Sequence, residues 1–111
     1  MLEQWQSFGT FKYNFLVMKI EHNIENFRGE FKAIENDRQI IGTMTYTRSG
    51  DNKISIDHTE VSPVFEGRGI GHTLVKEAVR YAREQHLKIQ PLCWFVKLVL
   101  TRTPEYKDVL A

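Results

Sequence analysis

The chain has 111 residues, 41% of them hydrophobic and 26% charged, and its formal net charge is +1. This length suits a single domain with one core and leaves no room for a cofactor domain beside a substrate domain. A net charge so close to zero provides no broad field for nucleic acid or a membrane surface, so we expect neither as a partner. The lone cysteine, Cys93, excludes an internal disulfide and a cysteine-based zinc site, and it favours a cytoplasmic location.

The first 17 residues show neither helical nor strand periodicity, whereas a regular strand pattern begins near Lys19. Polar residues interrupt their apolar side chains well short of a membrane span. A later translation start at Met18 would account for the change of pattern. We therefore expect residues 1–17 to be an N-terminal appendage, not necessarily native, to a domain over residues 18–111. Its aromatic side chains could equally cover a sheet edge.

Three later segments are predicted to be strands, namely residues 31–34, 40–47 and 53–61. The polar clusters between them are typical of turns, so the three strands should form an antiparallel meander. In the last strand, strict alternation predicts one shared face for four side chains: Ile54, Ile56, His58 and Glu60.

An apolar stripe at four-residue spacing predicts a long helix that begins near Ile70 and ends near Gln85. Residues 87–89 follow as a short buried strand, and residues 94–101 as a second helix that Pro104 stops. The strand after the long helix should be a parallel neighbour of an earlier strand, because a crossover connects them. The expected fold is therefore α+β: an antiparallel meander, a crossover helix, a parallel strand and a second helix.

Three glycines, Gly67, Gly69 and Gly71, alternate between the end of a strand and the long helix. Backbone N–H groups can converge on an anion at such a place, and the helix dipole adds positive potential. A simple tight turn would explain the same glycines. A dinucleotide-binding fingerprint would need glycine at position 72, and a P-loop would need lysine there, but the residue is His72. A pyrophosphate cradle without a metal remains, which points towards a coenzyme A derivative.

The residues around this loop resemble the signature of the GNAT superfamily of N-acetyltransferases: His58-Thr59-Glu60-Val61, Pro63, Gly67-Arg68-Gly69-Ile70-Gly71 and Leu74. Two later segments resemble the compact branch of that superfamily: Pro91-Leu92-Cys93-Trp94 and Pro104-Glu105-Tyr106. The resemblance covers most of the chain from Met18 onwards. It implies that the parallel strand splays away from the meander to admit a thioester.

The resemblance also implies the cofactor, acetyl-CoA, and the residues that bind it. Carried over by position, Val61 and its neighbours pair with pantetheine. The pyrophosphate falls on the loop and the first helical residues: Gly67, Arg68, Gly69, Ile70, Gly71 and His72. Glu66 departs from the superfamily, which usually has a basic or amide residue there, and Arg68 is expected to supply the compensating charge.

Acetyl transfer to an amine needs a base for the amine and a proton for the departing thiolate. Glu60 and His58 could remove a proton through water, although they could equally be a solvated acid and a core histidine. The resemblance places Val99 where most of the superfamily has a tyrosine acid, and Thr103 where the compact branch often has histidine. Cys93 could be the acid or a transient acetyl carrier, or simply a small buried core residue.

These observations predict an acetyl-CoA-dependent N-acetyltransferase whose acceptor is an amine of a small molecule, a lysine or an N-terminus. No metal is expected. Val99 and Thr103 favour the alternative, a module that binds acyl-CoA with little or no turnover.

Overall fold

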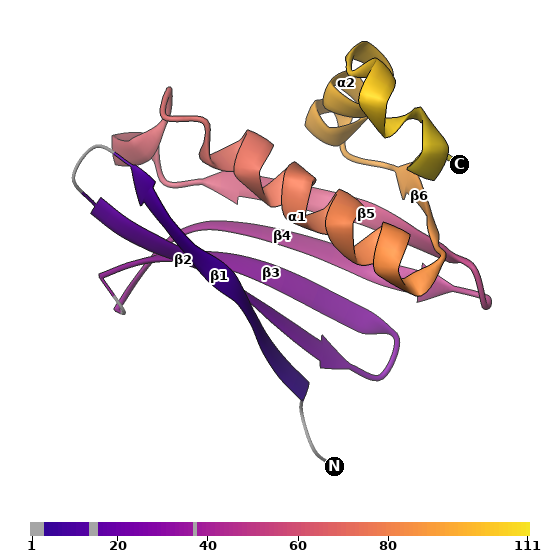
Figure 1. Ribbon diagram of the computed structural model, residues 1–111, viewed down its shortest axis with the longest axis horizontal. Helices are drawn as coiled ribbons and strands as arrows, with labels where there is room; N and C mark the ends of the chain where they lie inside the picture. Colours follow the sequence, from indigo (N-terminus) through magenta and orange to yellow (C-terminus); the bar gives the residue numbers. More distant parts are fainter. Residues whose placement is uncertain (1–3, 14–15, 37) are drawn as a thin grey trace.

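The computed structural model describes the backbone of residues 4–13, 16–36 and 38–111, and the side chains of residues 18–36 and 38–111. Its elements follow in the order β1 (Gln4–Tyr13), β2 (Leu16–Glu25), β3 (Arg28–Glu35), β4 (Gln39–Ser49), β5 (Lys53–Val61), η1 (Pro63–Phe65), α1 (Ile70–Gln85), β6 (Lys88–Pro91), α2 (Trp94–Arg102) and η2 (Pro104–Val109). Figure 1 shows the meander of β1 to β5, the crossover helix α1, and β6 with α2 beyond it.

One six-stranded sheet contains all the strands in chain order. Strands β1 to β5 pair antiparallel, whereas β6 lies parallel to β5 because α1 carries the chain back across the sheet. The predicted α+β fold is confirmed: the segments 31–34, 40–47 and 53–61 lie within β3, β4 and β5. The long helix and the second helix also begin where the sequence predicted.

The N-terminal part of the sheet was predicted incompletely, because only three antiparallel strands were expected and the structure has five. Residues 4–13 form β1 at the sheet edge, and β2 begins at Leu16, before the pattern near Lys19. A register shift between Ser7 and Thr10 interrupts the pairing of β1 with β2, and such a shift disrupts the alternation that identifies a strand. Since β1 pairs with β2 alone, we still propose that residues 1–17 are an appendage.

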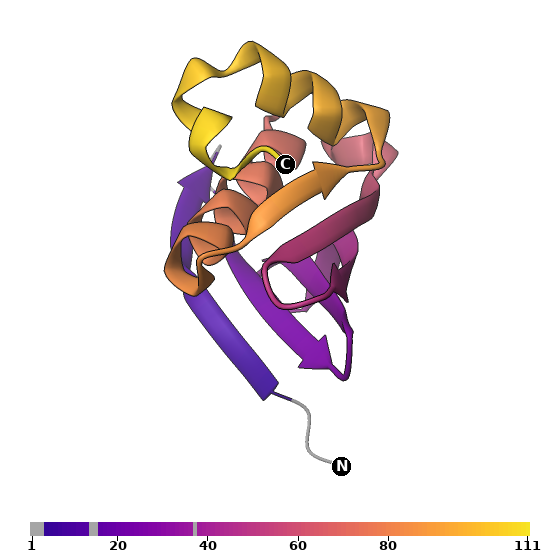
Figure 2. The ribbon, with the colours of Figure 1, turned by 90° about the vertical axis from the view of Figure 1, so that its right-hand side faces the viewer.

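The core lies between α1 and the face of the sheet that curves around this helix (Figure 2). Residues from every layer are fully buried there, including Ile20, Phe31, Met44, Ile54, Leu74, Ile89 and Leu100. Helix α2 and η2 lie together on the β6 side of α1 in both views (Figures 1 and 2). This arrangement leaves the start of α1 and the start of α2 facing each other across the end of β5.

A buried histidine joins the sheet to α1. His22 is fully buried, its Nε2 lies 2.6 Å from the Tyr46 hydroxyl, and its ring stacks on Phe31 with the centroids 4.1 Å apart. Tyr81 of α1 meets the same ring edge-on at 4.5 Å. Burial, with a smaller contribution from the nearby Arg80 charge, lowers the pKa of His22 to about 4. The imidazole is therefore neutral in the folded protein at neutral pH.

The low pKa of His22 predicts an acid-sensitive core. The folded-state pKa of His22 lies below the unfolded value of 6.5, so protonation of His22 favours the unfolded protein. The contribution of neutral His22 to the free energy of unfolding is therefore complete above about pH 6.5 and is lost as the pH falls towards 4. Urea unfolding should show a loss of about 2.5 kcal/mol from this group between neutral pH and about pH 4.5. A folded His22→Gln protein should lose correspondingly less over the same interval. An equal loss in both proteins would contradict the assignment.

Candidate functional site

The pairing of β4 with β5 shifts by one residue where β5 approaches the glycine loop. Thr45 pairs with His58 and the next residue, Tyr46, pairs with Ile56, so Asp57 is an extra residue on β5. Such a β-bulge moves the following side chains to the opposite face of the sheet. The bulge therefore decides which side chains of β5 lie towards α1.

The predicted shared face of Ile54, Ile56, His58 and Glu60 is therefore wrong. Beyond the bulge, Thr59 and Val61 lie opposite the core residues Met44 and Gly42, whereas His58 and Glu60 are exposed on the other face. Alternation alone did not reveal this, because an inserted residue changes the parity of the strand without changing its sequence pattern. The alternative of His58 as a buried core histidine is excluded by its exposure.

The bulge residue is held in place by polar contacts. Thr45 Oγ1 donates a hydrogen bond of 2.6 Å to Asp57 Oδ1, and Arg28 Nη2 lies 3.6 Å from Oδ2. Burial alone would raise the pKa of Asp57, but the Thr45 hydrogen bond and the Arg28 charge outweigh it and the pKa is lowered. A carboxylate thus fixes the position at which β5 changes faces.

Strands β5 and β6 part just before the bulge. Their pairing ends at Ile56 opposite Pro91, and the Ile56 carbonyl accepts hydrogen bonds from the N–H groups of Leu92 (2.9 Å) and Cys93 (3.1 Å). The chain then turns into α2. In the part of the chain that the structure describes, no strand lies beside residues 57–61 on this edge, so their backbone can pair with an extended ligand.

The glycine loop has the conformation of an anion-binding turn. Gly67 and Gly69 have φ values of 83° and 77°, a region that favours glycine. A Cβ at either position would meet nothing within 4 Å, so the backbone is accessible from the outside. A tight turn alone would explain these φ values, but the start of α1 that follows adds backbone N–H groups that could bind an anion.

Helix α1 begins with unpaired donors. Its first hydrogen bond runs from the Thr73 N–H to the Gly69 carbonyl, 3.0 Å away. The N–H groups of Ile70, Gly71 and His72 precede that bond, so they have no acceptor within the helix. These groups and the helix dipole make the start of α1 suited to a phosphate.

A pocket of about 760 Å³ connects the glycine loop to the place where β5 and β6 part. This volume is typical of small-molecule sites. It is lined by His58, Thr59, Val61, Phe65, Glu66, Gly67, Gly69, Ile70, Gly71, His72, Cys93, Trp94 and Phe95. The pocket therefore brings together most of the site residues predicted from the sequence. It does not include Glu60, nor Arg68, whose guanidinium lies 5.1 Å from the centre of the Phe65 ring.

Thr59 and Phe95 are among the lining residues that were not predicted as part of the site. The Thr59 hydroxyl is buried and has no hydrogen-bond partner among the described residues, and alternation would have turned it away from the core. Phe95 lies in the segment predicted only as a helix, residues 94–101. Its ring would lie 2.9 Å from a Cβ at Gly71 and meets His72 edge-on at 5.3 Å. The start of α2 thus packs directly on the start of α1.

Cys93 comes immediately before α2 and lines the pocket beside Trp94, whose side chain is 73% exposed. Its carbonyl accepts the first hydrogen bond of α2, from the Lys97 N–H at 3.0 Å. Val99 is buried on the core side of the same helix. Among the described residues that line the pocket there is no tyrosine. Cys93 therefore places a half-buried thiol in the wall of the pocket.

Two chemical features are absent from the described residues. No helix there is long and apolar enough to cross a membrane. Nor does any group of three or more histidine, cysteine, aspartate or glutamate side chains in that part of the chain come together in a way that could hold a metal ion.

The chain is similar to known proteins in its sequence. A family model described as GCN5-related N-acetyl-transferase matches residues 30–109. Protein NATD1 of Xenopus tropicalis is 29% identical over 87 residues, which cover 78% of each chain, and that of Mus musculus is 28% identical over 78% of this chain and 77% of its own.

Solved structures show the same fold. A GCN5-like protein from Staphylococcus aureus, solved by NMR in solution, is 33% identical with a TM-score of 0.64, covering 81% of this chain and 86% of its own. A GNAT family acetyltransferase from Elizabethkingia anophelis with acetyl-CoA bound has a TM-score of 0.57 at 21% identity, covering 68% of this chain and 52% of its own.

The contact between Gly71 and Phe95 predicts coupling between the two helix starts. Gly71→Ala should destabilise the protein even though alanine favours a helix, because the new methyl group displaces the Phe95 ring. In a Phe95→Leu background the same change should be neutral or stabilising. The free energy of unfolding in urea is measured for the unmodified protein, for each single variant and for the double variant. Additive effects of the two substitutions would contradict the contact.

Proposed function

The chain belongs to the GCN5-related N-acetyltransferase family, and from that premise we propose that it transfers the acetyl group of acetyl-CoA to an amine. The observation that carries this proposal is a continuous pocket with two different walls. One wall is the donor-rich start of α1, and the other is the unpaired edge of β5 beyond Ile56. A coenzyme with a pyrophosphate at one end and an extended amide chain at the other matches both walls.

The residues present fit acetyl-CoA. The N–H groups of Gly71 and His72, with the accessible backbone at Gly67 and Gly69, would hold the pyrophosphate. The backbone near Val61 would pair with pantetheine, and the unpartnered Thr59 hydroxyl can hydrogen-bond to a ligand in the pocket. A structural neighbour that contains acetyl-CoA supports this choice. When bound, acetyl-CoA supplies the acetyl group as a thioester.

The protein's own groups would manage two protons. His58 lines the pocket and is exposed, so its imidazole can take a proton from an incoming ammonium group, directly or through water. Glu60 lies outside the pocket on the same exposed face and would act through water. Cys93 Sγ–H would donate a proton to the departing thiolate, since no tyrosine is among the described lining residues.

The acceptor would reach the pocket from solvent. His58 and Glu60 are exposed, and Trp94 at the pocket is largely exposed as well. Such an open approach suits an amine on a small molecule, on a lysine or at an N-terminus. The lone cysteine and a net charge of +1 support a cytoplasmic protein whose partners are acetyl-CoA and this acceptor rather than nucleic acid.

A second function is favoured by a specific observation. Val99 occupies the place at which the family resemblance implies a tyrosine acid, and it is buried in the core. A protein without that acid could hold acyl-CoA with little turnover. Release of free thiol from acetyl-CoA in the presence of a panel of amines separates the two functions, because only the transferase releases it.

Binding at the loop is tested with two glycines of the same backbone conformation. Gly69→Val places a side chain in the open space of the predicted pyrophosphate site, whereas Gly50→Val does so in the turn between β4 and β5, where φ is 69°. Both changes strain the backbone. Calorimetry should show at least about tenfold weaker acetyl-CoA binding for Gly69→Val only. Equal affinities in the two folded variants would exclude the loop.

The role of Cys93 is tested with two substitutions. If the thiol donates the proton, Cys93→Ala and Cys93→Ser should both release thiol far more slowly, because a serine hydroxyl is much less acidic. Their acetyl-CoA affinity should stay within about tenfold of the unmodified protein, since the loop provides most of the binding. Full activity of both variants at saturating acetyl-CoA would remove Cys93 from the mechanism.

A further inference from the structure

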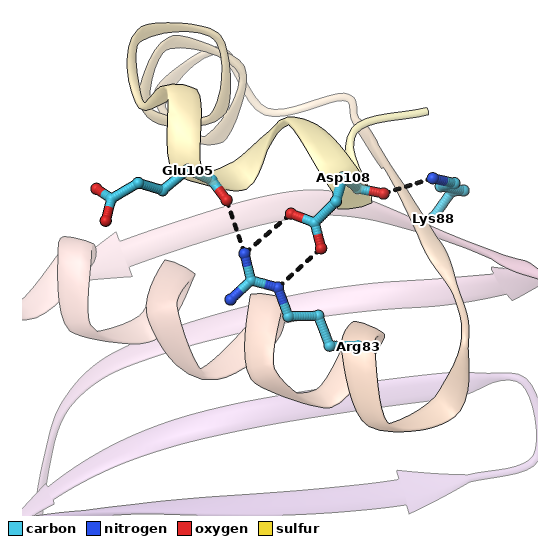
Figure 3. Close-up of polar contacts among 4 residues, drawn as sticks. All are labelled: Arg83, Lys88, Glu105 and Asp108. Atoms are coloured by element: carbon cyan, nitrogen blue, oxygen red, sulfur yellow. Dashed lines mark hydrogen bonds and ion pairs between the residues drawn. The ribbon is translucent and has the colours of Figure 1, made fainter.

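A cluster of polar contacts joins four residues of α1, β6 and η2, which we call the C-terminal latch: Arg83, Lys88, Glu105 and Asp108 (Figure 3). None of the four lines the pocket. Arg83 Nε and Nη2 donate to the two carboxylate oxygens of Asp108, each at 2.9 Å. Arg83 Nη2 also donates to the Glu105 carbonyl at 2.7 Å, and Lys88 Nζ donates to the Asp108 carbonyl. The latch joins the last turn of α1 and the start of β6 to η2.

The geometry of the latch fixes the orientation of Asp108 relative to Arg83. Single ion pairs on a protein surface contribute little, and Arg83 and Asp108 are both about half exposed. Two parallel bonds from a planar guanidinium to one carboxylate, however, fix both position and angle. The hydrogen bonds from Arg83 hold the pKa of Asp108 below its usual value, so the pair stays charged.

The Pro104-Glu105-Tyr106 motif is explained by the same cluster. Tyr106 is partly buried against the core and its ring lies 5.9 Å from the Arg83 guanidinium carbon. It is not among the residues that line the pocket. The end of the chain is fixed as well, because the Ala111 N–H donates to the Ile89 carbonyl at 2.9 Å and Val109 is buried. Tyr106 therefore anchors the tail.

Helix α2 lies between two fixed points. Its start is tied to β5, where the Cys93 N–H reaches the Ile56 carbonyl, and its end runs through Thr103 directly into η2. The first turn of α2 contributes the pocket wall formed by Cys93, Trp94 and Phe95. Because a nine-residue helix moves as a rigid body, a displacement of η2 changes the tilt of that wall.

We propose that Arg83 and Asp108 are positioning residues, which act through η2 and α2 to hold the Cys93–Phe95 wall at the distance from α1 that coenzyme binding requires. The consequence for acetyl-CoA rests on the proposed function, whereas the consequence for the order of α2 does not. Neither residue touches the pocket.

The test compares Arg83→Gln, Asp108→Asn and their combination with Glu84→Gln as the control. Glu84 pairs with Arg80 on the same helix at 2.8 Å and contacts no part of η2 through that pair. Amide hydrogen exchange is measured without ligand at Cys93 and Lys97, whose N–H groups donate to the Ile56 and Cys93 carbonyls. Acetyl-CoA affinity is measured by calorimetry. All proteins are compared at a temperature at which each is fully folded, so that a loss of overall stability does not enter.

Each single latch variant should speed exchange at Cys93 and Lys97 and weaken acetyl-CoA binding by about threefold, as expected for a partly exposed pair. The combination should be no worse than either single variant, because both remove the same contact. Arg83→Lys should fall in between, and Glu84→Gln should change neither quantity. Unchanged exchange at Cys93 and Lys97 in the latch variants would overturn the proposal. If the unmodified protein binds no acetyl-CoA, the proposed function fails, and exchange alone decides the latch.

Discussion

The site depends on one carbonyl group. Ile56 O accepts N–H groups from both Leu92 and Cys93, which ends the pairing of β5 with β6 and turns the chain into α2. One wall of the pocket follows from this separation. The separation exposes the edge of β5 to a ligand and places Cys93 where β5 and β6 part. It also directs the first turn of α2 towards α1. A longer β6 would fill the space beside the edge of β5 with protein backbone.

The glycines of the loop allow a tight turn at two positions and close packing at a third. Gly67 and Gly69 adopt positive φ in open space, so their lack of a side chain matters for the turn and for access to a ligand. Gly71 has an ordinary helical conformation, and its lack of a side chain makes room for Phe95. One sequence motif therefore sets the shape of the proposed pyrophosphate site and also the distance between two helices.

Much of this arrangement could be predicted from the sequence, because its signals are local. The apolar stripe from Ile70 identified α1, and the alternating glycines identified the loop. The bulge at Asp57 could not be predicted, since it depends on how β4 and β5 pair, and it reversed the expected face of His58. Strand β1 lacks clear alternation, and Phe95 has an apolar side chain like any core residue, so neither was recognised.

We propose that acetyl-CoA binds in the pocket between the edge of β5 and the start of α1. Titration of isotope-labelled protein with acetyl-CoA, followed by amide chemical shifts, tests it directly. We expect the largest changes in two separate segments, residues 57–61 and residues 69–72, at the same ligand concentration. Changes confined to other parts of the sheet, or changes at the loop with none along β5, would contradict it.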